Sequence, residues 1–577
     1  MRKYYKYFIL FIIVMISIAT VNVDAAIGYT YSHDGKPIYS SVGYSVASDG
    51  VYTVISDAWV NEEERLPTNN FKSPADLFIY TEKDEDGNET DVIYVVDSTS
   101  NNLFIFDGNL NYVKRFEEFE VKPENFTEEQ IIPVKTEKKT FSQYLLDSKG
   151  NKTISDFLAI ADIEYKDRDD SEKFYIKASG LSGVYRTTRP LRDERGFRIK
   201  DQFQDVIYLA DRDNNQIIIL DSKTYDVIQV VTSPTDVSFA GKQFNPIRVV
   251  TDGPGRMFVI SDNVYEGIMQ MTYDGKFSSY VGVNYVSLTF WQVIQRRFMT
   301  DEQLKSQLAV LNTTFTSMEM DHEEFIYTTS SAINNTDDSA MIKRINPSGD
   351  DVLTRNGYSV PKGDLVYIRT GGEASLRGPS RFSAIAVNDY GVYTAADAKT
   401  GRLFTYDDEG NLLYISAGSG SQLTNIENPV AIRYQGENIL VLDKKNSTIL
   451  RYEPTQIAKV INTATKYHYE GKLTEASREW SKVVAINPNY EYAYVGIGKT
   501  LFEEERYKEA MEYFKLGYNV NYYSRAYKLS RDETINKYFP AFISIAVVFL
   551  GAWYGVKIYK KYKHRKLNPD EVGEDYE

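Results

Sequence analysis

Pairs of short apolar runs recur along the middle of this chain, and they constrain its fold more than any other feature. The stretch IYVVDSTSNNLFIFD at 93–107 has the same form as IYLADRDNNQIIILD at 207–221: a β-rich run, an Asp, a polar turn and a second run. Further copies begin at Met257, Val392 and Ile439, and a weaker one at Phe325. Two such runs joined by a turn rich in Asp, Asn, Ser or Gly are typical of a β-hairpin.

Additional strands are predicted on both sides of these hairpins. A proline precedes several copies and starts a further strand, at Pro74, Pro246, Pro379 and Pro429. Another β-rich run, such as Tyr112–Phe116, follows several copies. The first run of each pair is nearly all apolar, as expected for a strand that is covered on both faces. Units of four strands repeated around an axis protect their sheet edges, so the pattern predicts an all-β propeller.

The two quoted stretches make the chain resemble the NHL-repeat family of six-bladed β-propellers. The resemblance covers about Ser73–Tyr452, and it implies a six-bladed propeller at 73–454 after an N-terminal lead-in at 26–72. Residues 117–200 carry no clean copy of the motif and are either an insertion or a worn blade. Residues 287–311 have apolar residues at helical spacing, which predicts a helical insertion between two blades.

An aspartate recurs where each hairpin turn leaves its first strand. The set consists of Asp97, Asp211, Asp262, Asp397 and Asp443. A metal or catalytic role is one interpretation. Because the residue belongs to the whole repeat, we favour a structural role in which Asp accepts hydrogen bonds from nearby backbone N–H groups.

After Pro454 the strand pattern gives way to helical periodicity with a period of 34 residues, in which Ala476 matches Ala510 and Trp480 matches Phe514. This part resembles the tetratricopeptide repeats, with two copies inside 455–530. The resemblance implies a concave partner-binding face on the first helix of each repeat. By position that face holds His468, Tyr469, Tyr492, Lys499 and Phe502. The alternative is a shallow groove that the propeller or the following helix covers.

One segment near the C-terminus predicts a membrane span. No charged residue occurs between Phe539 and Val556, close to the ~20 apolar residues that cross a bilayer. Lysines and an arginine follow at once, and such residues stay on the cytoplasmic side. We therefore expect a single transmembrane helix at 538–556 in the cell membrane, a cytoplasmic tail at 557–577 and an extracellular N-terminal part.

The N-terminus predicts export. Arg2, Lys3 and Lys6 precede the apolar run Tyr7–Thr20, and small residues near Ala25 suit cleavage, which together predict a signal peptide at 1–25. The alternative is an uncleaved anchor, which would make the chain span twice. The 577 residues include no cysteine, and export without disulfides suits a bacterial surface protein.

Composition and motifs narrow the function. The net charge of −15 with no basic stripe argues against nucleic acid as a partner. The chain has no HExxH or G-x-S-x-G motif and no phosphate-binding glycine loop, so we assign no catalytic residue and no cofactor. We expect a binding or scaffold protein. Its propeller would recognise a carbohydrate, small-molecule or protein ligand, its helices a protein partner at the membrane surface, and it would act in solute or polysaccharide uptake.

Two other functions stay open at this point. One is a metal-dependent, lactonase-like hydrolase, which would bring a divalent metal whose ligands the motifs do not identify. The other is a structural assembly factor of the cell envelope.

Overall fold

The computed structural model describes residues 28–31, 37–40, 42–53, 71–83, 86–121, 163–168, 171–193, 197–236, 239, 242–282, 314–330, 341–355, 361–364, 380–420, 422 and 425–567. The predicted signal peptide, the predicted helix at 287–311, Pro379 and the end of the tail lie outside the described residues. The chain divides into two compact units, Met1–Lys459 and Val460–Glu577.

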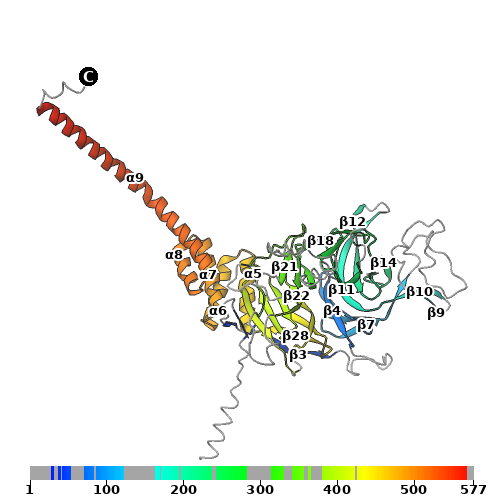
Figure 1. Ribbon diagram of the computed structural model, residues 1–577. Helices are drawn as coiled ribbons and strands as arrows, with labels where there is room; N and C mark the ends of the chain where they lie inside the picture. Colours follow the sequence, from blue (N-terminus) through cyan, green and yellow to red (C-terminus); the bar gives the residue numbers. More distant parts are fainter. Residues whose placement is uncertain are drawn as a thin grey trace, which may run out of the picture. The chain divides into compact units, whose positions relative to one another are not determined.

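The first unit is the predicted six-bladed β-propeller (Figure 1). Blade 1 consists of β4 (Pro74–Lys83), β5 (Glu89–Asp97), β6 (Asn102–Asp107) and β7 (Tyr112–Phe116). Blade 2 contains β11 (Leu181–Arg192), β12 (Arg198–Asp211), β13 (Gln216–Asp221) and β14 (Val227–Thr232). Blade 3 consists of β15 (Asn245–Thr251), β16 (Met257–Asp262), β17 (Ile268–Met271) and β18 (Phe277–Val281).

The remaining blades continue the same antiparallel order. Blade 4 contains β19 (Phe315–Met320), β20 (Ile326–Ser330) and β21 (Ile342–Ile345). Blade 5 consists of β22 (Phe382–Val387), β23 (Tyr393–Asp397), β24 (Arg402–Tyr406) and β25 (Leu412–Ala417). Blade 6 consists of β26 (Pro429–Gln435), β27 (Asn438–Asp443), β28 (Thr448–Pro454) and β3 (Tyr44–Thr53). The hairpins that the sequence predicts therefore form the second and third strands of the blades.

The strand β3 closes the ring. It comes from the segment interpreted as a lead-in and pairs with β28, so that Tyr44 lies opposite Pro454 and Thr53 opposite Thr448. Figure 1 shows the blue β3 beside the yellow β28. A separate hairpin of β1 (Gly28–Tyr31) and β2 (Pro37–Ser40) precedes it. Pairing the two ends of the propeller in one sheet ties the first and last blades together and removes a free edge.

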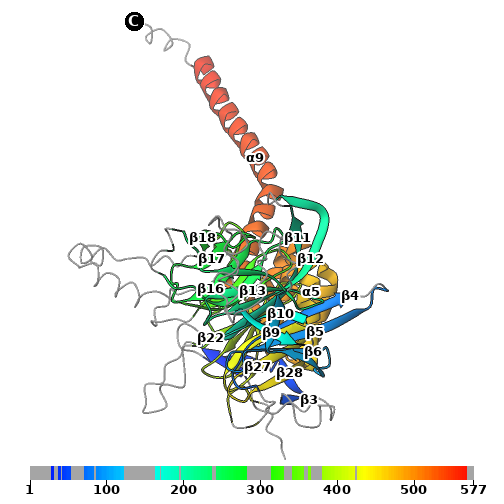
Figure 2. The ribbon, with the colours of Figure 1, turned by 90° about the vertical axis from the view of Figure 1, so that its right-hand side faces the viewer.

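Residues 117–200 serve two purposes. Three strands, β8 (Glu118–Val121), β9 (Ile163–Arg168) and β10 (Ser171–Lys177), extend the sheet of blade 2 beyond β14. The same segment also contains β11, the inner strand of that blade. The β4–β5 and β11–β12 hairpins are the longest of the propeller, and Figure 2 shows both reaching beyond its body.

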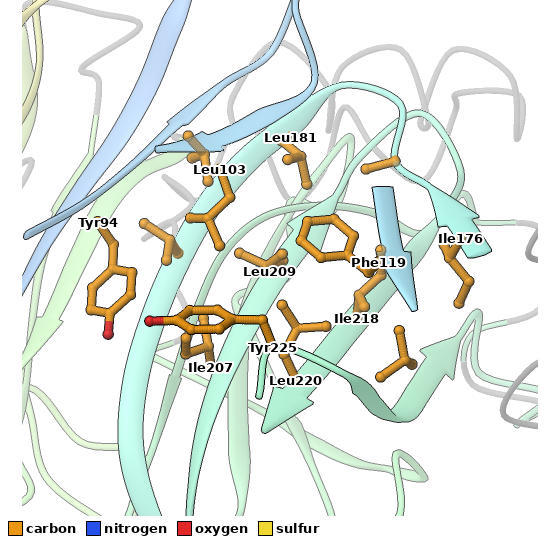
Figure 3. Close-up of a cluster of buried hydrophobic side chains, with 14 of the residues drawn as sticks. Tyr94, Leu103, Phe119, Ile176, Leu181, Ile207, Leu209, Ile218, Leu220 and Tyr225 are labelled. Carbon is orange, nitrogen blue, oxygen red and sulfur yellow. The ribbon is translucent and has the colours of Figure 1, made fainter. Parts of the chain in front are cut away.

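The core lies between neighbouring blades. Tyr94 and Leu103 of blade 1 pack with Ile207 and Leu209 of blade 2, and Phe119 of β8 joins them (Figure 3). Clusters of the same kind fill the spaces between other neighbouring blades. Each middle strand is therefore covered on both faces, which explains why these runs are nearly all apolar rather than alternating.

The recurring aspartates fasten each hairpin to its own inner strand. Asp97 accepts hydrogen bonds from the backbone N–H groups of Ser73 and Thr99, at 2.7 and 2.9 Å. Asp211, Asp397 and Asp443 make equivalent bonds. The structural interpretation is confirmed for these four. In blade 3 it requires a correction, because Ser261 takes the repeat position, bonding the N–H of Asn245 at 2.9 Å, while Asp262 pairs with Arg212.

The second unit is helical. The helices are α5 (Gln456–Tyr469), in which the unit begins, α6 (Leu473–Ile486), α7 (Glu491–Glu503), α8 (Tyr507–Leu516) and α9 (Val520–Leu567). The predicted small positions Ala476 and Ala510 are fully buried. A Cβ atom on Gly498 would lie 2.7 Å from the ring of Phe514, so only glycine lets α7 approach that ring closely.

The helix α9 has two parts. Its first turns pack on α8, where the rings of Phe514 and Tyr522 stack at 5.2 Å and Ala526 is fully buried. Farther along, apolar side chains such as Phe542 and Val548 are exposed. The helix is long and apolar enough to cross a membrane, and it includes the predicted span at 538–556 (Figure 1).

Candidate functional site at the propeller axis

The six inner strands β4, β11, β15, β19, β22 and β26 surround the axis, each in contact with its neighbours. Each has a register irregularity of one residue at the same place. The extra residues are Ala75, Ser182, Ile247, Thr316, Ser383 and Val430. A β-bulge leaves one residue outside the ladder and re-aims the backbone, so these bulges present carbonyl and side-chain groups to the axis.

Hydroxyl groups at three of these bulges connect neighbouring blades. Ser182 Oγ donates to the carbonyl oxygen of Pro246 at 2.9 Å, and Ser383 Oγ donates to that of Pro429 at 2.6 Å. Thr316 Oγ1 donates to the carbonyl oxygen of Phe382 at 2.9 Å. These bonds satisfy carbonyl groups that the bulges leave out of the sheets.

The side chain of Arg248 collects the bulge carbonyls of four blades. Its Nη2 donates to Ala75 at 3.0 Å and to Val430 at 3.1 Å. Its Nη1 donates to Ile247 at 2.8 Å and also to the carbonyl oxygen of Ser182. Arg248 is buried, and the cost of burying a charge is offset only by such hydrogen bonds and a counter-ion.

The counter-ion of Arg248 is Asp76 of β4. The Oδ1 atom of Asp76 lies 3.5 Å from Nε of Arg248, and its Oδ2 accepts the backbone N–H of Val184 at 3.1 Å. Burial lowers the pKa of Arg248, while Asp76 opposes this effect. One cation and one carboxylate therefore occupy the axis at the level of the bulges.

A second ion pair lies farther along the inner strands. Glu319 of β19 accepts the backbone N–H of Val387 at 3.0 Å, and its Oε1 lies 3.8 Å from Nε of Arg433. Arg433 Nη1 donates to the carbonyl oxygen of Ile432 at 2.7 Å and more weakly to that of Ile385 at 3.5 Å. Burial raises the pKa of Glu319 to about 7, although Arg433 and the Val387 N–H act in the opposite direction.

Two aromatic rings complete this second level. The Cζ atom of Arg433 lies 5.9 Å from the ring centroid of Phe78, and the Phe78 ring lies 5.0 Å from that of Tyr185. Phe78, Tyr185 and Glu319 are partly exposed, so solvent reaches this level. The second level therefore combines an ion pair with an apolar, aromatic surface.

A metal centre requires several ligating side chains that converge on one point. Among the residues that the structure describes, no group of three or more His, Asp or Glu side chains lies close enough to hold a metal ion. At the bulge level the converging carbonyl oxygens are already bonded to a guanidinium. The lactonase-like alternative stays a hypothesis.

The residues predicted for partner binding lie on two helices. Tyr492, Lys499 and Phe502 come together on α7, where Lys499 Nζ donates to the Tyr492 hydroxyl at 3.3 Å. The first turns of α9 lie against them, since Tyr522 places its ring centroid 5.2 Å from Lys499 Nζ and 6.4 Å from the Phe502 ring.

His468 and Tyr469 lie on the last turn of α5, and Tyr469 is 37% exposed. The five residues thus divide between a cluster against α9 and a more exposed helix end.

The axial residues were not identified from the sequence. Arg248 and Arg433 are each the only charge in an inner strand that begins at or next to a proline, and Asp76 is the only charge in the first eight residues of β4, which also begins at a proline. A single charge in a strand that is covered on both faces would have marked them, because such a charge must find a buried partner.

Comparisons with known proteins add the following. No protein-family model and no curated protein matches the chain. Among solved structures, it is similar to a DUF4221-family member from Bacteroides vulgatus (10% identity, 72% of this chain and 98% of that one, TM-score 0.36). It is also similar to virginiamycin B lyase from Staphylococcus aureus (10% identity, covering 67% of this chain and 96% of that one, TM-score 0.32). At these values neither likeness carries an argument about function.

Proposed function

We propose that this protein is a membrane-anchored recognition protein of the bacterial cell surface, without catalytic activity. Its propeller, of the NHL type, would bind a ligand or partner at the axial residues. Its helices, of the tetratricopeptide type, would contact a protein partner near the membrane. A role in solute or polysaccharide uptake fits this arrangement.

One observation supports recognition over chemistry. The axis is held by two arginines, each with a carboxylate partner, and Arg248 is committed to the bulge carbonyls of four blades. A fixed cation at this place disfavours a second cation, whereas a hydrolase of the lactonase type would hold its metal on the axis. Guanidinium groups with spare donors suit the binding of polar ligands.

The anchor would be α9. The lysines that follow its apolar part, Lys557, Lys560, Lys561 and Lys563, are exposed and favour a cytoplasmic C-terminus. The propeller would then lie outside the cell. The exposed Tyr469 is the predicted contact residue that a partner reaches most easily.

The test uses the full-length protein in its own membrane. A photo-reactive residue replacing Tyr469 should cross-link to one membrane neighbour, while the same residue replacing Val113, which is 53% exposed on β7, should not. In detergent, lactone and ester panels with calcium, zinc or manganese should give no turnover above background. Identical adducts at both positions would contradict the partner contact. Turnover that a chelator abolishes would contradict the absence of catalysis.

A further inference from the structure

We propose that the propeller axis binds a small ligand through a carboxylate group, which the unbonded edge of the Arg433 guanidinium holds beside Phe78 and Tyr185. This inference rests on the proposed recognition function and names the class of ligand that the same site takes.

The first argument is the unsatisfied state of Arg433. The residue is only 5% exposed, yet its hydrogen bonds all come from Nη1. Within the described residues, Nε and Nη2 donate no hydrogen bond, and Nε is buried with the nearest carboxylate oxygen 3.8 Å away. A buried donor without an acceptor is costly, so this edge favours an acceptor brought from outside the chain.

The second argument is the geometry of a guanidinium. Nε and Nη2 present their N–H groups side by side in a planar fork that matches the two oxygens of a carboxylate. The hydrogen bonds of the Arg248 guanidinium go to backbone carbonyl groups, so that arginine is a structural element. Arg433 differs because its Nε–Nη2 edge donates no hydrogen bond within the described residues and only faces the Glu319 carboxylate, with Nε 3.8 Å from Oε1.

The charges around Arg433 also permit an anion. Asp76 is paired with Arg248, and the remaining nearby carboxylate is that of Glu319. Burial raises the pKa of Glu319 to about 7, so at neutral pH it bears only part of its negative charge. The groups that act electrostatically on Glu319 or feel its charge are Arg433, Asp76, Asp321, Tyr185 and Tyr434. Protonation of Glu319 removes the closest repulsion to a bound carboxylate.

The rings of Phe78 and Tyr185 define the rest of the ligand. They are tilted at 59° to each other, are partly exposed and lie next to the guanidinium. An apolar or aromatic group attached to the carboxylate would contact them, as in most small-molecule sites, where a few polar groups orient a ligand against apolar walls. The simplest probe with both parts is benzoate.

The test is a titration of the full-length protein in detergent with benzoate and with its neutral isostere benzamide, followed by calorimetry and by thermal unfolding. Benzoate should bind saturably and raise the unfolding temperature, whereas benzamide should do neither. Arg433→Lys keeps the charge but removes the fork, and it should weaken benzoate binding about tenfold or more, equal to about 1.4 kcal/mol. Phe78→Leu should weaken benzoate more than acetate.

The matched control is Arg402→Lys. Arg402 lies on β24, off the inner ring, and pairs with Asp364 at 2.9 Å, so its replacement should leave benzoate binding unchanged. Three results would each overturn the inference. Benzamide could bind as well as benzoate, Arg433→Lys could keep the wild-type affinity for benzoate, or the protein could fail to respond to benzoate because only water occupies the Nε–Nη2 edge. If benzoate fails while the Tyr469 cross-link persists without turnover, the inference falls and the proposed function stands. If a chelator-sensitive turnover is found, the proposed function falls.

Discussion

Arg248 and Val430 are joined by a hydrogen bond of 3.1 Å between Nη2 and the carbonyl oxygen, although they stand 182 positions apart in the chain. The bond connects the inner strand of blade 3 with that of blade 6. Together with the bonds to Ala75 and Ser182, it makes Arg248 a shared element of the ring.

Replacing Arg248 with Met should therefore destabilise the propeller strongly. The Met side chain leaves the bulge carbonyl groups without hydrogen-bond donors and Asp76 without its counter-ion. Breaking a buried ion pair in this way costs about 3–5 kcal/mol of folding free energy. Denaturant unfolding of the propeller signal measures this loss. Arg402→Met removes an ion pair away from the axis and should lower the free energy of unfolding much less. Equal losses in the two variants would show that the Arg248 bonds at the axis contribute no more to stability than an off-axis pair.

The stability of the propeller should fall with rising pH through the titration of Glu319. Burial raises its pKa from the ordinary 4.5 to about 7 in the folded state. The folded protein therefore holds the proton more tightly, so the stabilisation is complete below pH 4.5 and is lost as the pH rises to about 7 and beyond. Glu319→Gln should remove this part of the profile, on the order of 3 kcal/mol in all.

The control for that profile is Glu323→Gln, which alters an exposed carboxylate in the turn after the same strand and should keep the wild-type slope. Other buried acids, such as Asp211 with its pKa raised to about 6, titrate in all three proteins and cancel in the comparison. A Glu319→Gln profile parallel to that of the wild type would mean that Glu319 keeps its charge throughout.

Features formed by residues close together in the chain could be predicted from the sequence, whereas features formed by residues far apart in the chain could not. The hairpins follow from local patterns, and Tyr112–Phe116 is a strand with the predicted bounds. The closing strand β3 has its partner about four hundred residues away in the chain and carries no copy of the motif, so local reasoning could not pair it. The axial site is harder still, because Asp76, Arg248, Glu319 and Arg433 come from four blades and meet only when the ring closes.

Glu505 offers a way to stabilise the helical unit. It occupies the turn position that Gly471 holds in the preceding helical pair, and both residues have a left-handed backbone, with φ of 60° and 72°. A side chain in this region costs about 1 kcal/mol, so Glu505→Gly should raise the free energy of unfolding by that amount. Glu503→Gly, within α7, should lower it by about 1 kcal/mol. Thermal melts followed at the helical signal distinguish these changes, and a destabilised Glu505→Gly would contradict the strain.

A large residue at Ala510 should unfold the helices and spare the propeller. Ala510 is fully buried in α8, and the helical unit has its own compact core, so Ala510→Arg must separate helices at a cost of about 1–3 kcal/mol or more. Amide hydrogen exchange should show lost protection in α6–α8 with the blades unchanged. Glu512→Arg, on the exposed side of the same helix, should change neither region. Loss of protection in the blades as well would indicate one shared core.

The absence of cysteine permits a direct test of the central claim that α9 anchors a recognition propeller outside the membrane. A single cysteine is introduced either at Val113 in the propeller or at Tyr562 near the end of α9, both of which are exposed. In intact cells whose wall admits the reagent, a membrane-impermeant maleimide should label Val113→Cys at once and Tyr562→Cys only after the membrane is opened. Labelling of Tyr562→Cys in intact cells, with Val113→Cys protected, would contradict the account.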